Sequence, residues 1–434
     1  MKVTKADLLP LKAVLLYISI GVSLSFFGSI EYYEYDKLSV FLYIASFLIL
    51  FTLGYLRGAI APSKPRTQDR SSQKLFNNIL FWVKLCIFIM FIVQLITLIT
   101  SVASGGLNLS ISKMGEAYAN SYDGYVRGTG NISFTFLIQT LTYMPYLVSL
   151  ILGVFYYKHL PKKYKIMLFF VYISIVLIET IGHGKQKQFG DLLIFLLTTW
   201  LLKNNLSVKK IRKKIIRKVS FFALLGASGL VFILSFRYIF LNIDTNNINE
   251  KLNSSIQFNT DHWIFTVFPD SIAFPLTVFS GYLSQGYYGL SLALQQPFEW
   301  TYFVGNSYSM SVLLNRYFNL PVDFHDTYPY RTSLVTSWDD TKWSTVFTWY
   351  AGDFTFIGTL LFFSLVAFFY AKVWHEAYKY KNPISIILFS MLTIALLYIP
   401  ANNQLMHTPG SVIAVFIFII LWLLKHKKYN IHAY

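Results

Sequence analysis

The chain has 434 residues, of which 55% are hydrophobic and 13% carry a charge. A soluble domain needs roughly 25% charged residues to cover its surface, so a water-soluble enzyme of this size is excluded. The formal net charge of +17 would suggest nucleic acid in a soluble protein, but in a membrane protein it records orientation, because cytoplasmic loops collect Lys and Arg. Apolar runs of about 20 residues recur, so we expect an all-α polytopic membrane protein with no nucleic-acid partner.

Ten apolar segments are predicted to span the membrane as helices, because the bilayer core cannot hydrogen-bond an unpaired backbone. An even number puts both termini on one side, and Lys2, Lys5 and Lys12 put that side in the cytoplasm. Under this topology the inside loops hold 26 of the 37 cations but only three of the 20 acids. The predicted spans are 13–30, 38–55, 79–100, 133–156, 166–181, 189–202, 219–240, 354–371, 384–400 and 411–424.

One segment predicted to lie outside, 241–344, is far longer than the other outside connections. It contains 21 aromatic residues, and its prolines are expected to break it into short pieces. We therefore expect a helical extracytoplasmic cap between spans 1–7 (residues 1–240) and spans 8–10 (residues 345–434). Alternatively, 263–300 forms a pair of membrane-dipping segments, although Asp270 and two prolines argue against this.

The turn between the fifth and sixth predicted spans carries two lysines on the side of the membrane that is otherwise poor in cations. Its sequence over 182–188 is GHGKQKQ, and the glycines would let the backbone fold closely around an anion. Lys185 and Lys187 are therefore candidate phosphate ligands, unless they reach to lipid phosphates from an interfacial turn. Arg237, near the outer end of the seventh span, is a further candidate, unless it pairs with an acid such as Asp244.

Residues 323–331 place two acids, a histidine and an arginine among aromatic residues. His325 or Asp326 could act as a general base there, and Arg331 could be a second anion ligand. The alternative is a solvated loop with local turns. No metal site is predicted, because the eight histidines are scattered and no pair stands at helical i,i+4 spacing beside an acid.

Aromatic side chains of the predicted cap are candidates for contact with a glycan. Asp339, Asp340 and Lys342 lie next to two tryptophans, a composition typical of sugar binding, although outer-interface belts are rich in tryptophan as well. The candidate glycan-binding residues are Tyr287, Tyr288, Trp300, Trp338 and Trp343.

Three stretches carry a family resemblance: SQGYYGLSLAL over 284–294, Gly-Asn-Ser over 305–307, and TVFTWYAGDF over 345–354, followed by Gly358. Together they are similar to oligosaccharide repeat-unit polymerases, the Wzy or O-antigen polymerase family. The predicted topology agrees, with termini inside and one large outer loop late in the chain. Where that family often has Arg in the turn after the fifth span, this chain has Lys, which keeps the charge but loses the bidentate fork.

The resemblance implies a GT-C-type glycosyltransferase in the bacterial cytoplasmic membrane, acting at its outer face without a cofactor. Such an enzyme joins glycan on undecaprenyl pyrophosphate to a second lipid-linked repeat unit, among membrane lipids and with a possible chain-length regulator protein as partner. Cations would stabilise the leaving pyrophosphate, and a base would accept the proton of the attacking hydroxyl. The pyrophosphate candidates are Lys185, Lys187, Arg237 and Arg331; the base candidates are His325 and Asp326, then Asp353, which could instead cap the helix of span eight.

Three alternatives stay open. An O-antigen ligase shares the architecture and differs in its acceptor. A flippase or other transporter would show internal repeats and ionisable groups at the bilayer midplane, whereas the unusual cations here lie near the outer surface. A membrane O-acyltransferase would need a histidine deep in a span, and the predicted spans contain none.

Overall fold

A computed structural model describes residues 3–60, 72–103, 110, 113–117, 134–204, 206, 208–240, 245, 247–251, 254–319, 324–338 and 342–425. The chain divides into two compact units. The first unit comprises Met1–Pro62, Ile243–Lys372 and Leu392–Val412, and the second comprises Ser63–Asn242, Val373–Met391 and Ile413–Tyr434. These units cross the predicted domain limits at 240 and 344, because nearly all of the segment 241–344 groups with the first two predicted spans. We call this segment the outer segment, after the side of the membrane predicted for it.

The all-α architecture is confirmed, and each of the ten predicted spans coincides with helix. Among the described residues, seven helices are long and apolar enough to cross a membrane, while α8, α16 and α17 are shorter. The total of ten spans therefore stays a prediction. The helices at the ten segments are α1 (Leu9–Phe27), α2 (Lys37–Ile60), α3 (Ser72–Ala103), α5 to α6 (Phe134–Leu147 and Gly153–Phe155), α7 (Lys162–Ile175), α8 (Lys187–Lys203), α9 (Lys209–Phe240), α15 (Thr345–Tyr380), α16 (Pro383–Leu397) and α17 (Pro409–Lys425).

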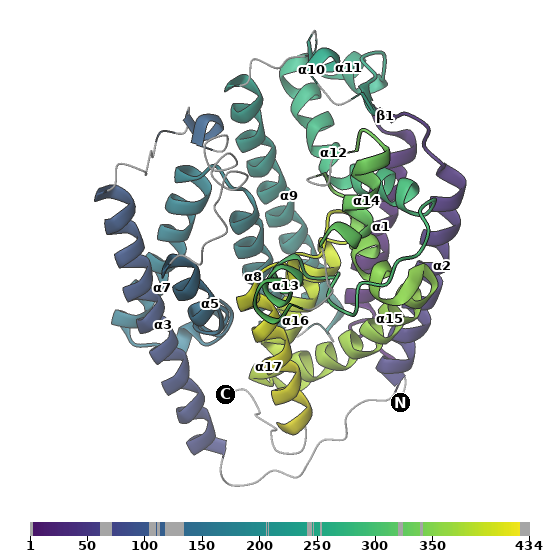
Figure 1. Ribbon diagram of the computed structural model, residues 1–434. Helices are drawn as coiled ribbons and strands as arrows, with labels where there is room; N and C mark the ends of the chain where they lie inside the picture. Colours follow the sequence, from purple (N-terminus) through teal and green to yellow (C-terminus); the bar gives the residue numbers. More distant parts are fainter. Residues whose placement is uncertain are drawn as a thin grey trace. The chain divides into compact units, whose positions relative to one another are not determined.

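The outer segment contains one long helix, α12 (Asp270–Ala293), which runs beside α1 in the first unit (Figure 1). Gly21 lies well inside α1, and a Cβ atom there would stand 3.0 Å from the Leu283 carbonyl oxygen and 3.0 Å from the Tyr287 ring. The expectation of short pieces is therefore wrong for this stretch, since α12 continues through Pro275. α12 packs against α1, the first predicted span.

A short antiparallel ladder joins the connection between α1 and α2 to the outer segment. Strand β1 (Ile30–Tyr32) pairs with β2 (Ile256–Phe258), with Ile30 opposite Phe258. The ladder holds the start of the outer segment beside the end of α1. The remaining elements here are α10 (Ile248–Lys251), α11 (Trp263–Val267), α13 (Tyr308–Phe318), η5 (Phe324–Asp326), α14 (Tyr328–Val335) and η6 (Gln404–Met406).

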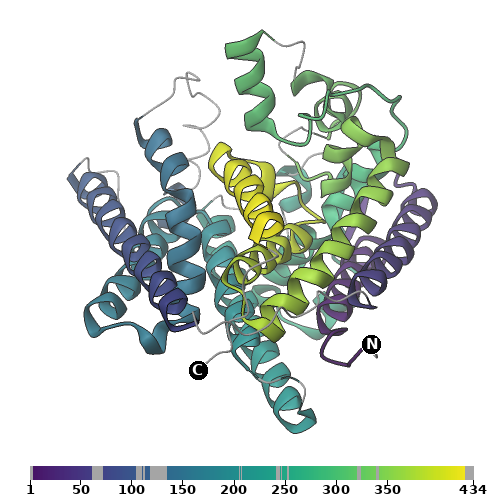
Figure 2. The same ribbon diagram turned by 90° about the horizontal axis from the view of Figure 1, so that it is seen from below.

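Helices α2 and α15 of the first unit approach each other closely, as Figure 2 shows for the purple and light-green ribbons. Gly54 and Gly58 are one helical turn apart on α2. A Cβ atom on Gly54 would stand 2.0 Å from the Ser364 carbonyl oxygen, and one on Gly58 would stand 2.3 Å from that of Phe368. This is the small-xxx-small packing of membrane helices.

In the second unit, α3 packs on α5 and α7, and α8 packs on α9. Two segments of this unit are wound as π-helix: η2 (Val148–Leu152) continues α5, and η4 (Val176–Gly182) continues α7. Both contact α8. A short 3-10 turn, η3 (Tyr157–His159), leads into α7. Wide π turns inside α-helices occur frequently at functional sites.

Candidate functional site

Asp353 in α15 is buried, with 4% of its surface exposed, and its carboxylate accepts four hydrogen bonds. Oδ1 accepts from the Thr301 hydroxyl (2.5 Å) and the Gly305 amide (3.2 Å). Oδ2 accepts from the Asn306 amide (3.0 Å) and the Asn306 side chain (2.7 Å). Since a carboxylate offers about four lone-pair sites, all of them are occupied. Asp353 therefore holds the turn 301–307 in place and has no lone pair left for a substrate proton.

The interpretation of Asp353 as a helix cap is wrong, because α15 begins at Thr345 and Asp353 lies inside it. The helix kinks at Thr355, whose φ is 63°. The Thr355 hydroxyl accepts a hydrogen bond from the Gly358 amide (3.2 Å) and so caps the second part of the helix. The kink also frees the Gly352 carbonyl oxygen, which accepts from the Thr301 amide (3.0 Å).

The turn 301–307 is strained. Tyr302 and Phe303 have φ values of 54° and 63°, in the left-handed region that costs a non-glycine residue about 1–3 kcal/mol. The bonds from Asp353 to the following residues stabilise this conformation. Strain of this kind gathers at functional sites, where the surrounding structure enforces it.

Segments far apart in sequence meet around this turn and the start of α15. The Asn403 side chain donates to the Asn306 carbonyl oxygen (2.7 Å), and the Ser307 hydroxyl donates to that of Met406. Thr345 donates its amide to the Ala401 carbonyl oxygen (2.9 Å). Gly286 of α12 packs directly on Pro400, whose carbonyl oxygen would lie 1.7 Å from an added Cβ. The three stretches that carry the family resemblance therefore meet in one place.

Exposed aromatic rings border the turn. Trp300 is 47% exposed and lies against the Tyr302 ring, with centroids 4.6 Å apart. Phe303 is also exposed and contacts the ring of Phe354, next to Asp353. Rings in this arrangement suit contact with sugar faces or with the membrane interface.

The other predicted glycan contacts have a different environment. Tyr288 and Trp338 are buried and form an aromatic cluster with Tyr32, whose ring stacks on Tyr288 at 5.0 Å. Tyr287 is fully buried beside α1. These rings present no open face, so they build the cluster that joins α12 to the β1–β2 ladder. Trp343 is partly buried against Tyr282; Asp339 and Asp340 lie outside the described residues.

Arg331 of α14 is held by neighbours in the first unit. Its Nη1 donates to the Pro297 carbonyl oxygen and to the Glu299 carboxylate, both at 3.0 Å, and its Nε donates to the Asp326 carbonyl oxygen (3.1 Å). Its guanidinium also lies over the Tyr328 ring. The Nη2 atom is buried without a partner among the described residues. The Glu299 carboxylate thus offsets the positive charge, and among the described contacts Nη2 is left to donate to a ligand.

His325 is exposed in η5, where its ring packs edge-on against Tyr330 with centroids 4.2 Å apart. Asp326 is in the same 3-10 turn and is partly buried. Exposure makes the His325 imidazole accessible to a substrate.

The predicted anion-binding turn of the second unit carries two lysines and is flanked by two acids. Lys187 pairs with Asp191 (2.7 Å), and Lys185 lies 3.8 Å from Glu179. Both ammonium groups are still partly exposed. Gly184 has a φ of 65°, as expected of a glycine in a tight turn. The turn is therefore close to neutral rather than strongly cationic. Arg237 lies in α9, but its side chain is outside the described part of the structure.

Sequence reasoning missed the two acids that flank this turn, Glu179 and Asp191, and the partners of Asp353. Glu179 and Asp191 lie within predicted spans, where any charge is a functional candidate; only the cations were considered there. Asn306 belongs to the Gly-Asn-Ser stretch over 305–307, and the sequence predicts no role for its side chain. Its pairing with Asp353, 47 positions away, cannot be read from local spacing.

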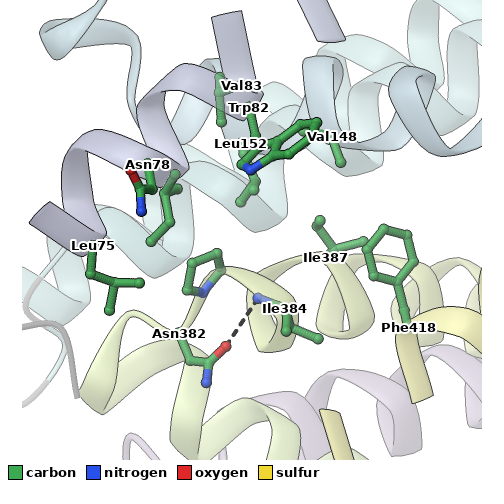
Figure 3. A pocket seen from close by; sticks show the side chains of 12 residues that line it. Leu75, Asn78, Trp82, Val83, Val148, Leu152, Asn382, Ile384, Ile387 and Phe418 are labelled. Carbon is green, nitrogen blue, oxygen red and sulfur yellow. Dashed lines mark hydrogen bonds between the residues drawn. The ribbon is translucent and has the colours of Figure 1, made fainter. Parts of the chain in front are cut away.

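A cavity of about 300 Å³ lies elsewhere in the second unit (Figure 3). Its lining is mostly apolar, with Trp82, Leu152 and Phe418 among the side chains that face it. The Asn382 side chain at its edge accepts from the amides of Ile384 and Ser385 and so caps α16. No predicted site residue lines this cavity.

Comparisons with protein families, with curated proteins and with solved structures find no match to this chain.

Proposed function

We propose that this chain is a membrane glycosyltransferase that polymerises undecaprenyl-pyrophosphate-linked oligosaccharide repeat units into surface polysaccharide. The observation that carries the proposal is the convergence around Asp353. The stretches 284–294, 305–307 and 345–354, which resemble the repeat-unit polymerases, are separate in sequence but in contact in the first unit. The sorting of cations into the inside loops supports an outward-facing site in a bacterial cytoplasmic membrane, with both termini inside.

The proposed reaction is a single displacement with inversion. The acceptor hydroxyl oxygen bonds to the anomeric carbon of the donor, the bond from that carbon to the pyrophosphate oxygen breaks, and a base takes the hydroxyl proton. Lys185, Lys187 and Arg237 are proposed to stabilise the departing pyrophosphate. His325, exposed in η5, is the proposed base, with Asp326 beside it. We expect activity to persist in the presence of EDTA.

Within this proposal Asp353 acts as a positioning residue. It holds the strained turn that presents Trp300, Tyr302 and Phe303 outward. The buried Asn306 Oδ1 has no partner in the described part of the chain, so the turn has one acceptor to offer a glycan hydroxyl. Arg331, already engaged by Glu299, is proposed to contact an anion only through its Nη2 corner.

Deletion of the gene followed by gel analysis of surface polysaccharide tests the proposal. A polymerase deletion leaves glycans of a single repeat unit on the cell surface. Loss of all surface attachment would instead indicate a ligase, and lipid-linked units trapped inside the cell would indicate a flippase. Either of those two results would contradict the proposed function.

A further inference from the structure

Five side-chain oxygens between residues 63 and 242 of the second unit are buried with no hydrogen-bond partner among the described residues. Three of them lie close together in the sequence: Thr180 Oγ1, Gln188 Oε1 and Asp191 Oδ1. Thr180 is 2% exposed and Asp191 is 8% exposed. Folded proteins satisfy nearly all buried polar side-chain atoms with a partner. Three unmet oxygens in one short stretch of chain therefore call for a ligand.

The three oxygens lie on the two arms of one hairpin. Gln188 and Asp191 are three residues apart on α8, so they share a face of that helix. Thr180 is on η4, the opposite arm, which contacts α8. The ring of Tyr146 in α5 lies against that of Phe195 on α8, with centroids 6.4 Å apart. An aromatic surface therefore lies beside α8.

The chemistry of these atoms selects a neutral hydrogen-bond donor. Carboxylate and amide oxygens only accept, so an anion does not fit them. A metal cation is disfavoured, because the Lys187 ammonium stands 2.7 Å from Asp191 Oδ2 and already balances that carboxylate. Hydroxyl groups donate without carrying charge. Beside α8 the rings of Tyr143 and Tyr146 are stacked with centroids 5.7 Å apart. They supply an apolar surface for a sugar ring.

We propose that Thr180, Gln188 and Asp191 form a carbohydrate-binding site for the sugar attached to the lipid pyrophosphate. The sugar hydroxyls donate to the three buried oxygens, and the partly exposed ammonium groups of Lys185 and Lys187 bind the adjoining phosphates. The wide turns of η2 and η4 shape the wall of this site against α8. That the bound sugar is attached to a lipid pyrophosphate rests on the proposed function, whereas sugar binding itself does not.

The test uses the full-length protein in lipid nanodiscs. Saturation-transfer difference NMR with the methyl glycosides of glucose, galactose and N-acetylglucosamine measures sugar binding, and inorganic pyrophosphate is titrated separately. We expect Thr180→Val and Asp191→Asn to weaken binding of the preferred glycoside by about two- to tenfold, the effect of one hydrogen bond. Thr198→Val is the matched control, because that hydroxyl already donates to the Ile194 carbonyl oxygen (2.8 Å).

The outcomes separate this inference from the proposed function. Absence of binding by all three glycosides, or equal binding by wild type and both site variants, would overturn the inference. Thermal stabilisation by NaCl that Asp191→Asn abolishes, without sugar binding, would assign the oxygens to a cation and also overturn it. Sugar binding that the variants weaken, in a chain whose deletion leaves polymer length normal, would support the site and reject the polymerase.

Discussion

A single carboxylate, Asp353, organises the turn that brings the resembling stretches together. Hydrogen bonds to a charged group contribute about 1.5–3 kcal/mol each, so this side chain outweighs its aromatic neighbours in holding Tyr302 and Phe303 in the left-handed region. Its burial inside α15 agrees with the positioning role proposed for it above.

Asp353→Asn is expected to destabilise the protein by about 2–4 kcal/mol, because its NH2 group replaces one carboxylate oxygen. That group would face either the Gly305 amide at the place of Oδ1 or the Asn306 amide at the place of Oδ2, donor against donor. Thermal unfolding in detergent measures this, and surface polysaccharide should shorten in parallel. Asp261→Asn is the control, since Asp261 is exposed in the same unit. Equal unfolding temperatures for the two variants would contradict the assigned role.

Lys381 lies in the connection between α15 and α16, and burial lowers the pKa of its ammonium to about 8. The folded state therefore binds fewer protons than the unfolded state between about pH 8 and the ordinary lysine value. The stability that the uncharged Lys381 amine contributes is complete above the ordinary lysine pKa. It is lost as pH falls from there through 8.

Raising the pH from 7 to 9.5 should accordingly stabilise the wild type relative to Lys381→Met by about 1–3 kcal/mol. Thermal unfolding of both proteins across this range measures the difference, in which the titration of all other groups cancels. A difference that does not change with pH would contradict the buried ammonium. The Lys381 side chain also donates to the Leu202 carbonyl oxygen, which Met cannot do.

At the scale of elements, the positions of the helices follow from the sequence. Every predicted span falls on a helix, because a long apolar run has no other way to satisfy its backbone in a membrane. The kink at Thr355 and the pairing of β1 with β2 could not be predicted, since neither has a local signal. Tyr288 and Trp338 were assigned to a glycan because exposure cannot be inferred from composition in so aromatic a segment.

The glycines of α2 give a prediction at this scale. Gly54→Ala should destabilise the first unit by about 1–3 kcal/mol, because its Cβ atom would overlap the Ser364 carbonyl oxygen and push α2 away from α15. Gly229→Ala in α9 is the matched control: the nearest atoms to its Cβ are 3.9 Å away, so it should be neutral or stabilising by up to about 1 kcal/mol. Urea or thermal unfolding compares them, and equal effects would contradict the close packing.

At the scale of the whole molecule, the proposed orientation can be tested with cysteine labelling. Cys86 is the single cysteine of the chain, so Cys86→Ala provides a background without thiols. In that background a membrane-impermeant maleimide should label Asp261→Cys in intact cells, and should label Lys210→Cys only after permeabilisation. The opposite pattern would place the outer segment in the cytoplasm and remove the basis for an outward-facing site.

The β1–β2 ladder sets an order on biosynthesis. Ile30 emerges early with the first span, but its partner Phe258 is 228 positions later. At synthesis rates of about 5–20 residues per second, β1 waits roughly 10–45 seconds with its backbone unpaired. The first two helices can insert before α12 exists, so the end of the first unit that carries the ladder closes only late in translation. During that interval the nascent chain exposes a strand edge that a chaperone could cover.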